Sequence, residues 1–400
     1  MMTECKKVIK VSGICLFSWL FAIAFAILVS CTGEEKEDTR FPVGKTAQFQ
    51  LVLSGTTSGD TRATGGALPD QEATINRLTV GLFFADGSVN TIVEPGVIPD
   101  ASGKLKTEKI LCSPGTCEVI VVANVPEGTF SGVQNKNEFI GKTVGLVQTV
   151  RDGQQASDLL PMSGISAEKV VLEADKTVAV AVGLSRMVAR ISIAGIRADF
   201  GLEYSKATFT LDRVFLCNAL EASRVSPGDV TQTIPAQPTW LHGGTVQEQP
   251  DGSFLWTKGA GFLLNDVTPE GGVVITNEEY KVPYWFYAFA NNDPNNRTKL
   301  VISGYFDPDG STGPKPKTYV YYPIVVNRSQ AGTIITPSDP SQITGVGDGT
   351  IARNRDYRIK AVIKGDGETN PGEEVTASNL ELTVSVDDWT LKIVQEVELN

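Results

Sequence analysis

Residue types that could do chemistry are scarce in this sequence. It has one histidine, His242, in a loop rich in proline and glycine, and no G-x-S-x-G segment lies nearby. A nucleophilic triad would have to use that histidine. Glycine motifs for phosphates or dinucleotides and EF-hand loops are also missing from the sequence. We therefore expect no enzyme, no cofactor and no metal, with a surface hydrolase using scattered carboxylates as an alternative.

Two cysteines lie close together in the sequence. Cys112 and Cys117 flank Ser-Pro-Gly and could close a small disulfide across a turn in an oxidising compartment. A zinc site would need a second pair or a nearby histidine. Alternatively, both cysteines are free and partly buried thiols. Their spacing in the sequence is compatible with either state.

The first thirty residues read as a targeting segment. Lys6, Lys7 and Lys10 precede an apolar run over 11–30, and the run ends in Leu-Val-Ser before Cys31. This arrangement resembles a bacterial lipobox, in which the cysteine is lipidated after cleavage. It predicts a lipoprotein signal peptide over 1–30 and lipid, such as palmitate, on Cys31. A plain membrane anchor is the alternative, because the run approaches the length of a span.

Composition and charge restrict the class of protein. The 400 residues are 41% apolar and 20% charged, as in ordinary globular proteins, and the formal net charge is −11. Nucleic-acid binding needs a basic surface, so we expect no nucleic-acid partner.

Short alternating runs separated by turn residues dominate the rest of the chain. Strand side chains alternate between two faces, so each run predicts one apolar face. The run 118–124 is continuously apolar, which predicts a strand buried on both faces. Only 137–151 suggests a short helix. This pattern predicts an all-β protein made of β-sandwiches with few short helices, and a domain boundary near Ser185.

Two apolar strands near the two ends of the chain match in length. The segments 45–55 and 389–399 each have eleven residues, or about 36 Å as strands. The first places Phe49, Leu51 and Leu53 on one face. In the second, apolar side chains share one face after the pattern changes phase at Asp387–Asp388: Trp389, Leu391, Ile393, Val397 and Leu399. One strand could replace the other in the same groove.

A set of ordered segments carries a family resemblance. They are the lipobox at Cys31, KTAQFQLVLSG, the loop with Arg62-Ala63, NRLTVGLFF, LCSPGTCEVIVVANVPEG, RMVARISI, and RNRDYRIKAVIKGDGETNP with LELTVSVDDWTLK. In this order the chain resembles the fimbrillins, the major pilin family of type V pili in Gram-negative gut and oral bacteria. The resemblance implies two transthyretin-like β-sandwich domains, over 63–185 and 186–400.

The resemblance also implies a maturation route. A precursor anchored in the outer membrane through its lipid would be cut between Arg62 and Ala63 by an Arg-specific protease. Arg62 is the only basic residue in the soft loop 56–69. The propeptide 31–62, with its tether and first strand, would leave, and with it Phe49, Leu51 and Leu53. The donor strand 389–399 of another subunit would fill the groove.

The expected partners are identical or related pilin subunits in a head-to-tail fibre, because such a contact does not close on itself. A chain with both a cut site and a donor strand is expected to be a shaft subunit of a cell-surface fimbria that supports adhesion. The alternatives are a minor tip or anchor subunit, or a monomeric surface lipoprotein that binds glycans through 284–287 or the loop 226–257.

Overall fold

The computed structural model describes twelve stretches of the chain: 45–55, 71–99, 105–228, 233–251, 254–266, 271–281, 284–310, 315–328, 333–337, 347–373 with 375, and 379–389. All of them fall within one compact unit, Phe41–Asn400. Cys31, Arg62, Ala63, Leu391, Ile393, Val397 and Leu399 lie outside the described residues. No helix in the described stretches combines the length and apolarity needed to cross a membrane.

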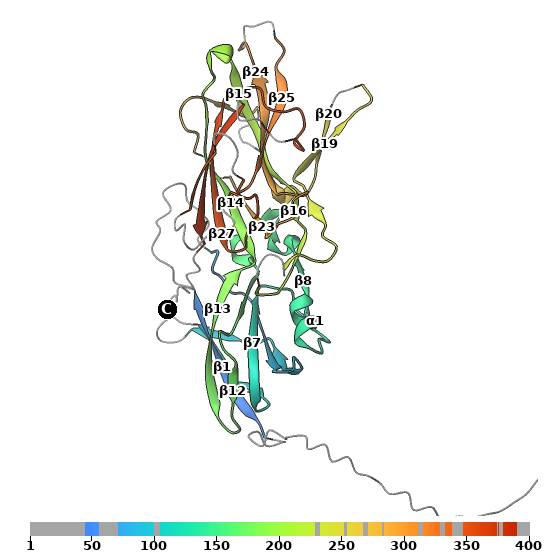
Figure 1. Ribbon diagram of the computed structural model, residues 1–400, viewed down its shortest axis with the longest axis vertical. Helices are drawn as coiled ribbons and strands as arrows, with labels where there is room; N and C mark the ends of the chain where they lie inside the picture. Colours follow the sequence, from blue (N-terminus) through green and yellow to red (C-terminus); the bar gives the residue numbers. More distant parts are fainter. Residues whose placement is uncertain are drawn as a thin grey trace, which may run out of the picture. The chain divides into compact units, whose positions relative to one another are not determined.

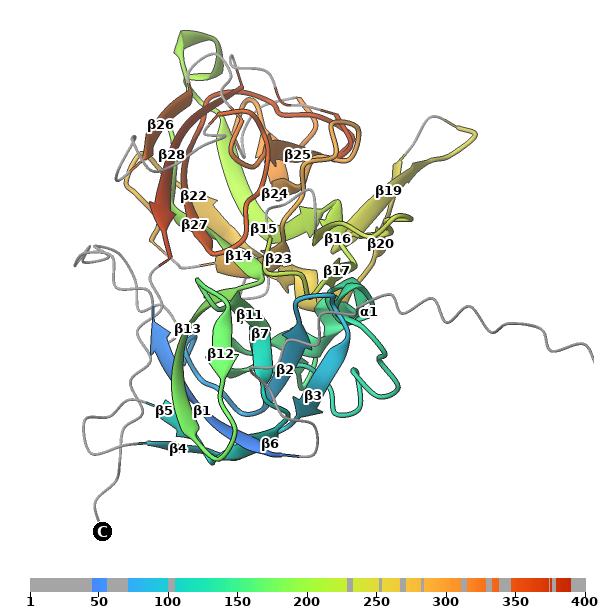
Figure 2. The ribbon, with the colours of Figure 1, turned by 60° about the horizontal axis from the view of Figure 1, so that its bottom comes forward.

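The strands before Met187 form mainly one ten-stranded sheet with the order β3-β2-β7-β11-β13-β1-β5-β4, to which β12 adds on β7 and β6 on β1 (Figure 2). Its strands are β1 (Ala47–Gly55), β2 (Leu78–Phe84), β3 (Val89–Val93), β4 (Val97–Pro99), β5 (Leu105–Thr107), β6 (Ile110–Cys112), β7 (Gly115–Ala123), β11 (Met162–Ile165), β12 (Val170–Leu172) and β13 (Thr177–Arg186).

This sheet buries side chains on both faces of β7. Val119 and Val121 join a core with Phe49, Leu51 and Leu53 of β1. Ile120 and Val122 point to the other face and join a different core. The prediction that 118–124 is buried on both sides is therefore confirmed for this central strand, since a strand covered on both faces needs no polar alternation.

The predicted helix is shorter than the pattern suggested. Helix α1 spans only Lys136–Gly141, and Asn135 caps it by accepting the Glu138 N–H at 2.9 Å. Thr143 and Val144 then enter a strand, as β-branched side chains favour. The rest of this region holds β8 (Thr143–Gly145), η1 (Leu146–Thr149), β9 (Val150–Arg151), β10 (Gln154–Gln155) and η2 (Ser157–Leu159).

After Met187 the main strands form two five-stranded sheets (Figure 1). The first has the order β23-β14-β27-β28-β26: β14 (Val188–Ala198), β23 (Tyr284–Phe289), β26 (Thr333–Pro337), β27 (Arg355–Ile363) and β28 (Leu380–Asp388). The second has the order β21-β15-β24-β25, with β22 also on β15: β15 (Thr208–Cys217), β21 (Leu264–Asp266), β22 (Val273–Ile275), β24 (Lys299–Asp307) and β25 (Thr318–Val325).

Short elements complete the described chain: η3 (Leu202–Tyr204), β16 (Ala219–Leu220), β17 (Ala222–Arg224), β18 (Trp240–Leu241), β19 (Gly244–Glu248), β20 (Phe254–Lys258) and η4 (Gly261–Leu263). Strand β17 pairs with β8, so a small ladder links the two parts of the chain. Strands β19 and β20 form a hairpin.

The all-β fold class is confirmed. Strand β28 buries the even-numbered side chains that its alternation predicts, Leu380, Leu382, Val384 and Val386. Within the segment 186–197, Arg186 and Arg190 are buried among apolar side chains. Their partners, described below, explain how a buried charge is tolerated here.

Candidate functional site

Strand β1 lies inside its sheet and not at an edge. It pairs in parallel with β13 from Gln48↔Thr177 to Gly55↔Leu184, and antiparallel on its other side with β5 and β6. Figure 2 shows β1 running between β13 and β5. Phe49, Leu51 and Leu53 are buried as the sequence predicted. Taking β1 out would therefore leave a slot bounded by two unpaired strand edges, which we call the β1 slot.

The walls of the β1 slot are apolar with a few directed polar groups. Opposite β1, strand β13 contributes Val180 and Val182 to the same core. On the other side, the Leu51 N–H donates to Thr107 Oγ1 at 3.0 Å. The Gln50 amide donates to the Thr107 carbonyl at 2.9 Å. An occupant of this slot thus needs an alternating apolar face and free backbone groups.

Cys112 forms part of the slot wall. It lies opposite Ala47 in the β6–β1 ladder and is buried, as is Cys117. Both are free thiols in the structure. Burial, with a smaller effect from Cys117, raises the pKa of Cys112 to about 11. The disulfide between Cys112 and Cys117 stays a prediction.

A second constellation surrounds Trp389, and we call it the Glu72–Trp389 cluster: Glu72, Arg186, Arg190, Tyr287, Asp356 and Trp389. Glu72 is its centre. One carboxylate oxygen accepts from Arg190 Nη1 at 2.7 Å and from the Trp389 indole N–H at 2.9 Å. The other oxygen accepts from the Tyr287 hydroxyl at 2.8 Å. The Glu72 carbonyl accepts from Arg186 Nε at 2.9 Å.

The Trp389 side chain is enclosed by this cluster. Its ring stacks on Tyr287 with centroids 5.7 Å apart, and the Arg186 guanidinium lies 4.1 Å from the ring centroid. Only 5% of the residue is exposed. The sequence had placed Trp389 on the donor face offered to another molecule. In this structure it packs into its own chain instead, because its indole N–H has a buried acceptor there.

Opposite charges balance within the cluster. Arg190 binds Asp356 through two nitrogens, at 3.0 and 2.7 Å, in addition to Glu72. Burial lowers the pKa of Arg190, but Asp356 and Glu72 outweigh that effect and raise it overall. Arg186 donates instead to the carbonyls of Glu72 and Trp389 and to the Asn354 side chain, and burial lowers its pKa to about 10. A buried ion pair is tolerated only when its charged groups make several well-aligned hydrogen bonds, as Arg190 does with Asp356 and Glu72.

Arg353 ties neighbouring strands to this cluster. Its guanidinium donates to the Ser163 hydroxyl at 2.9 Å and to the carbonyls of Ser185 and Ser226 at 3.0 and 2.9 Å. Burial lowers its pKa to about 10. Gln155 adds a further link, because its amide exchanges two 2.8 Å hydrogen bonds with the Tyr287 backbone. The cluster thus joins residues from distant parts of the sequence.

The cluster lies near the predicted cut site and the predicted donor segment in the sequence. Glu72 lies ten residues after Arg62, and Trp389 is the last described residue before 390–400. The sequence reasoning missed Glu72, Tyr287 and Asp356 as site residues. A signal existed in the charged residues inside the apolar segments RMVARISI and RNRDYRIKAVIK, since a charge within a strand core requires a partner.

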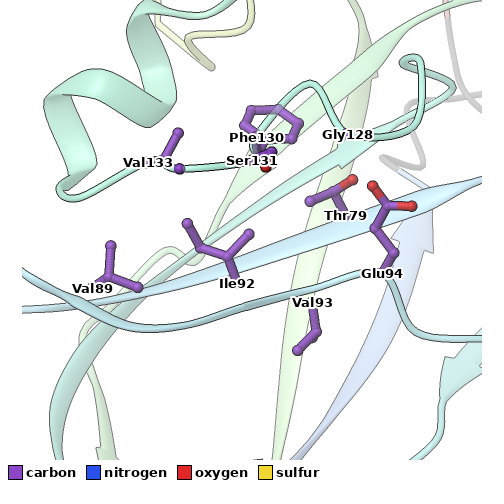
Figure 3. Close-up of a pocket in the computed structure, with 10 residues that line it drawn as sticks. Thr79, Val89, Ile92, Val93, Glu94, Gly128, Phe130, Ser131 and Val133 are labelled. Atoms are coloured by element: carbon purple, nitrogen blue, oxygen red, sulfur yellow. The ribbon is translucent and has the colours of Figure 1, made fainter.

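Other hollows and titratable groups carry less chemistry. A hollow of about 430 Å³ lies beside β2 and β3, where Ile92 points toward Phe130 and Val133 (Figure 3). Its carboxylate, Glu94, binds Arg77 at 3.0 Å. His242 is half-buried and not a solvated loop residue: its Nδ1 accepts the Asn218 N–H at 3.3 Å, and burial lowers its pKa. The described residues contain no side-chain group suited to a metal ion.

The aromatic run 284–287 is also not a surface feature. Tyr284, Phe286 and Tyr287 are buried in β23, and Trp285 packs partly against the core. The run therefore does not offer the open ring faces that a sugar site at 284–287 would need.

Comparison with solved structures shows the same fold in other proteins. The structure resembles that of a fimbrilin (FimA) from Porphyromonas gingivalis, with a TM-score of 0.62 at 22% identity over 88% of this chain and 99% of the other. It resembles equally a cell adhesion protein from Parabacteroides distasonis, with a TM-score of 0.62 at 22% identity over 87% of this chain and 100% of the other. A cell adhesion protein from Bacteroides eggerthii gives a TM-score of 0.58 at 21% identity, over 87% and 97% of the two chains.

The sequence itself points to the same family. Residues 47–195 match the family model of the major fimbrial subunit protein (FimA). Comparison with curated proteins gives no match. The resemblance to fimbrillins is thus confirmed. This partial match supports a relationship to fimbrial subunit proteins over 47–195.

Replacing Glu72 with glutamine should destabilise the fold by about 3–5 kcal/mol, because Arg190 loses one of two buried carboxylate partners. Urea unfolding of the full chain measures this change. The matched control is Glu127→Gln, which removes an Arg77 partner whose side chain is 79% exposed. The control should cost under about 1 kcal/mol. Equal effects of both changes would contradict the central role of Glu72.

Proposed function

We propose that this chain is a shaft subunit of a cell-surface fimbria that polymerises by strand exchange. In this proposal the precursor is an outer-membrane lipoprotein with lipid on Cys31, and an Arg-specific protease cuts between Arg62 and Ala63. The chain then loses β1, and the segment after Trp389 of another subunit enters the β1 slot. The observation that carries the proposal is the interior position of β1, paired on both sides.

Burial of apolar side chains favours a filled β1 slot both before and after the proposed cut. Burying Phe49, Leu51 and Leu53 contributes about 5–9 kcal/mol gross. Loss of β1 also exposes two rows of backbone groups, which is an aggregation hazard. Until cleavage, β1 fills the slot from within its own chain and so prevents premature assembly. After cleavage, Leu391, Ile393, Val397 and Leu399 offer about 6–12 kcal/mol gross, before ordering costs.

The lengths of the two strands fit this exchange. Strand β1 has nine residues, and Thr390 to Leu399 supplies ten. In the donor, the apolar side chains fall on alternate positions, as Phe49, Leu51 and Leu53 do. Because Trp389 is held in its own chain, we place the start of the donor strand at Thr390, one residue later than the sequence pattern suggested.

We assign a shaft position because the chain has both a predicted cut site and a predicted donor strand. A tip subunit would need no donor strand, and an anchor subunit would need no cut. The predicted domain limits at 63–185 and 186–400 fit this scheme, since β1 lies before the first and the donor strand ends the second.

The first prediction concerns the cut. Arg62→Ala should abolish fibre formation by the protease-treated precursor, because β1 stays covalently attached and keeps the slot filled. Electrophoresis without boiling should show a ladder for the wild type and a single band for the variant. Arg40→Ala is the control and should leave the ladder intact, since Arg40 precedes β1. A full ladder from Arg62→Ala refutes the assigned cut.

The second prediction concerns the donor segment. A chain that ends at Trp389 should fold with nearly wild-type stability but form no fibres after cleavage. A chain that ends at Asp388 should in addition lose several kcal/mol, because Glu72 and Tyr287 lose a buried partner. Urea unfolding separates the two truncations, and negative-stain microscopy reports fibres. Normal fibres from the chain ending at Trp389 would rule out 390–400 as the donor.

The third prediction uses Cys112 as a reporter of the slot. With its pKa raised to about 11, Cys112 should react slowly with a thiol reagent at pH 8 in the precursor, because only about one thiol in a thousand is ionised. In the cleaved chain that ends at Trp389, the slot is empty, the pKa returns toward its usual value, and labelling should rise at least ten-fold.

Peptide mapping after labelling identifies the modified cysteine. A synthetic peptide of residues 390–400 should restore protection of Cys112. Cys217, buried in the other part of the chain with its pKa raised by burial to about 12, is the internal control and should stay unreactive throughout. Unchanged labelling of Cys112 after cleavage would show that β1 does not leave.

A further inference from the structure

A groove on the outer face of the sheet β21-β15-β24-β25 is not used by strand exchange. The hairpin of β19 and β20 lies beside this sheet (Figure 1). Trp256 and Val246 of the hairpin pack against a small core that includes Phe215 and Val301. Between hairpin and sheet is an open groove of about 490 Å³, which we call the Trp256–Tyr305 groove. That volume is in the range of small-ligand sites.

Aromatic rings form the walls of the groove. Tyr305 is 41% exposed, and Trp256 and Tyr319 are half-buried. Tyr305 meets Tyr319 edge to face at 4.9 Å and 90°, and Tyr319 meets Tyr321 at 5.3 Å and 65°. The rings therefore present faces in different directions. They form a recess with side walls and not one flat platform, and aromatic contact with a ligand contributes strongly to binding.

A fixed polar network lies among the rings. The Tyr319 hydroxyl donates to Asp212 at 2.9 Å and accepts from Arg213 at 3.2 Å. Arg213 also pairs with Asp212 at 2.7 Å, and its guanidinium lies 4.5 Å from the Trp256 ring centroid. These contacts hold the rotamers of both the aromatic and the charged side chains before any ligand arrives, which reduces the entropy cost of binding.

The rim of the groove adds hydroxyls and a cation. Thr318 and Thr369 line it, and Lys317 Nζ lies 4.7 Å from the Tyr305 ring centroid. The indole N–H of Trp256 has no hydrogen-bond partner among the described residues and is covered. Gly244 packs against it, and a Cβ there would come within 2.6 Å of that nitrogen. The Trp256 ring thus keeps its place by packing and by the Arg213 contact.

We propose that the Trp256–Tyr305 groove binds a glycan, with a pyranose ring resting on the exposed aromatic faces. A pyranose has an apolar C–H face and a rim of hydroxyls, and the groove pairs ring faces with fixed donors and acceptors. An aliphatic peptide side chain would cover the rings but would make no hydrogen bonds to the Thr318 and Thr369 hydroxyls that line the groove. The Lys317 cation at the rim would also suit a carboxylate on an acidic sugar.

This assignment is independent of polymerisation. The groove belongs to a small core separate from the one that holds β1, so it is present in the uncleaved chain. Glycan binding can therefore be measured on the precursor without protease, and a failure of strand exchange leaves the result interpretable.

The test is an array of neutral and acidic oligosaccharides probed with the full uncleaved chain. Each sugar that binds is then titrated in solution by tryptophan fluorescence, with neutral and acidic forms compared. Tyr305→Ala should weaken binding roughly ten-fold or more, because the most exposed ring is lost. Tyr305→Phe keeps the ring and should stay within about two-fold of the wild type. Val274→Ala, on the exposed face of β22 in the same sheet, is the matched control and should change nothing.

Two results would overturn the proposal. One is a wild-type chain that binds no oligosaccharide on the array. The other is Tyr305→Ala binding as tightly as the wild type. If Tyr305→Ala instead reduces self-association in sedimentation while glycan binding is absent, the groove is a contact between copies of this chain, and the glycan assignment is wrong. Urea unfolding of each variant excludes loss of fold as the cause.

Discussion

A strand paired on both sides cannot leave its sheet without exposing two rows of backbone N–H and C=O groups. Strand β1 is in this position, between β13 and the strands β5 and β6. Buried backbone groups must be paired, so an empty slot is unstable toward any strand that can enter it. The proposed function uses this constraint twice. It keeps the precursor monomeric while β1 is in place, and it drives assembly once β1 is gone.

In the proposed strand exchange, the Glu72–Trp389 cluster would fix the position from which the donor segment starts. It holds a residue shortly after the proposed cut, the entry to β14 and the last residue before the donor segment in one buried network. Such networks contribute little net stability, but removing one partner is costly, so they favour a single arrangement. A donor strand anchored at Trp389 starts from a defined point. That limits the conformations which 390–400 must give up when it enters a neighbour.

Much of the fold could be predicted from period-two patterns. The apolar face of β1, the buried β7 and the even-numbered face of β28 follow from side-chain alternation, because each strand has a face on a core. The Glu72–Trp389 cluster could not be predicted in this way. Glu72 lies in an irregular segment and meets Arg190 across 118 residues and Trp389 across 317. Side-chain alternation predicts which face of a strand is buried, but it does not identify the distant residue that packs against that face.

The β1 slot and the Trp256–Tyr305 groove would select their ligands through different kinds of interaction. The β1 slot selects a strand by backbone pairing and an alternating apolar face, which many sequences satisfy. The Trp256–Tyr305 groove depends on individual rings and on the Asp212–Arg213–Tyr319 network, where one substitution changes what fits. Tyr321 of the groove belongs to a core distinct from the other two, and Trp256 and Tyr319 pack against that core. Substitutions in the groove can therefore change which ligand the proposed site binds without affecting β1 or the donor strand proposed to replace it. Subunits that assemble by the same proposed mechanism can thus differ in their binding grooves.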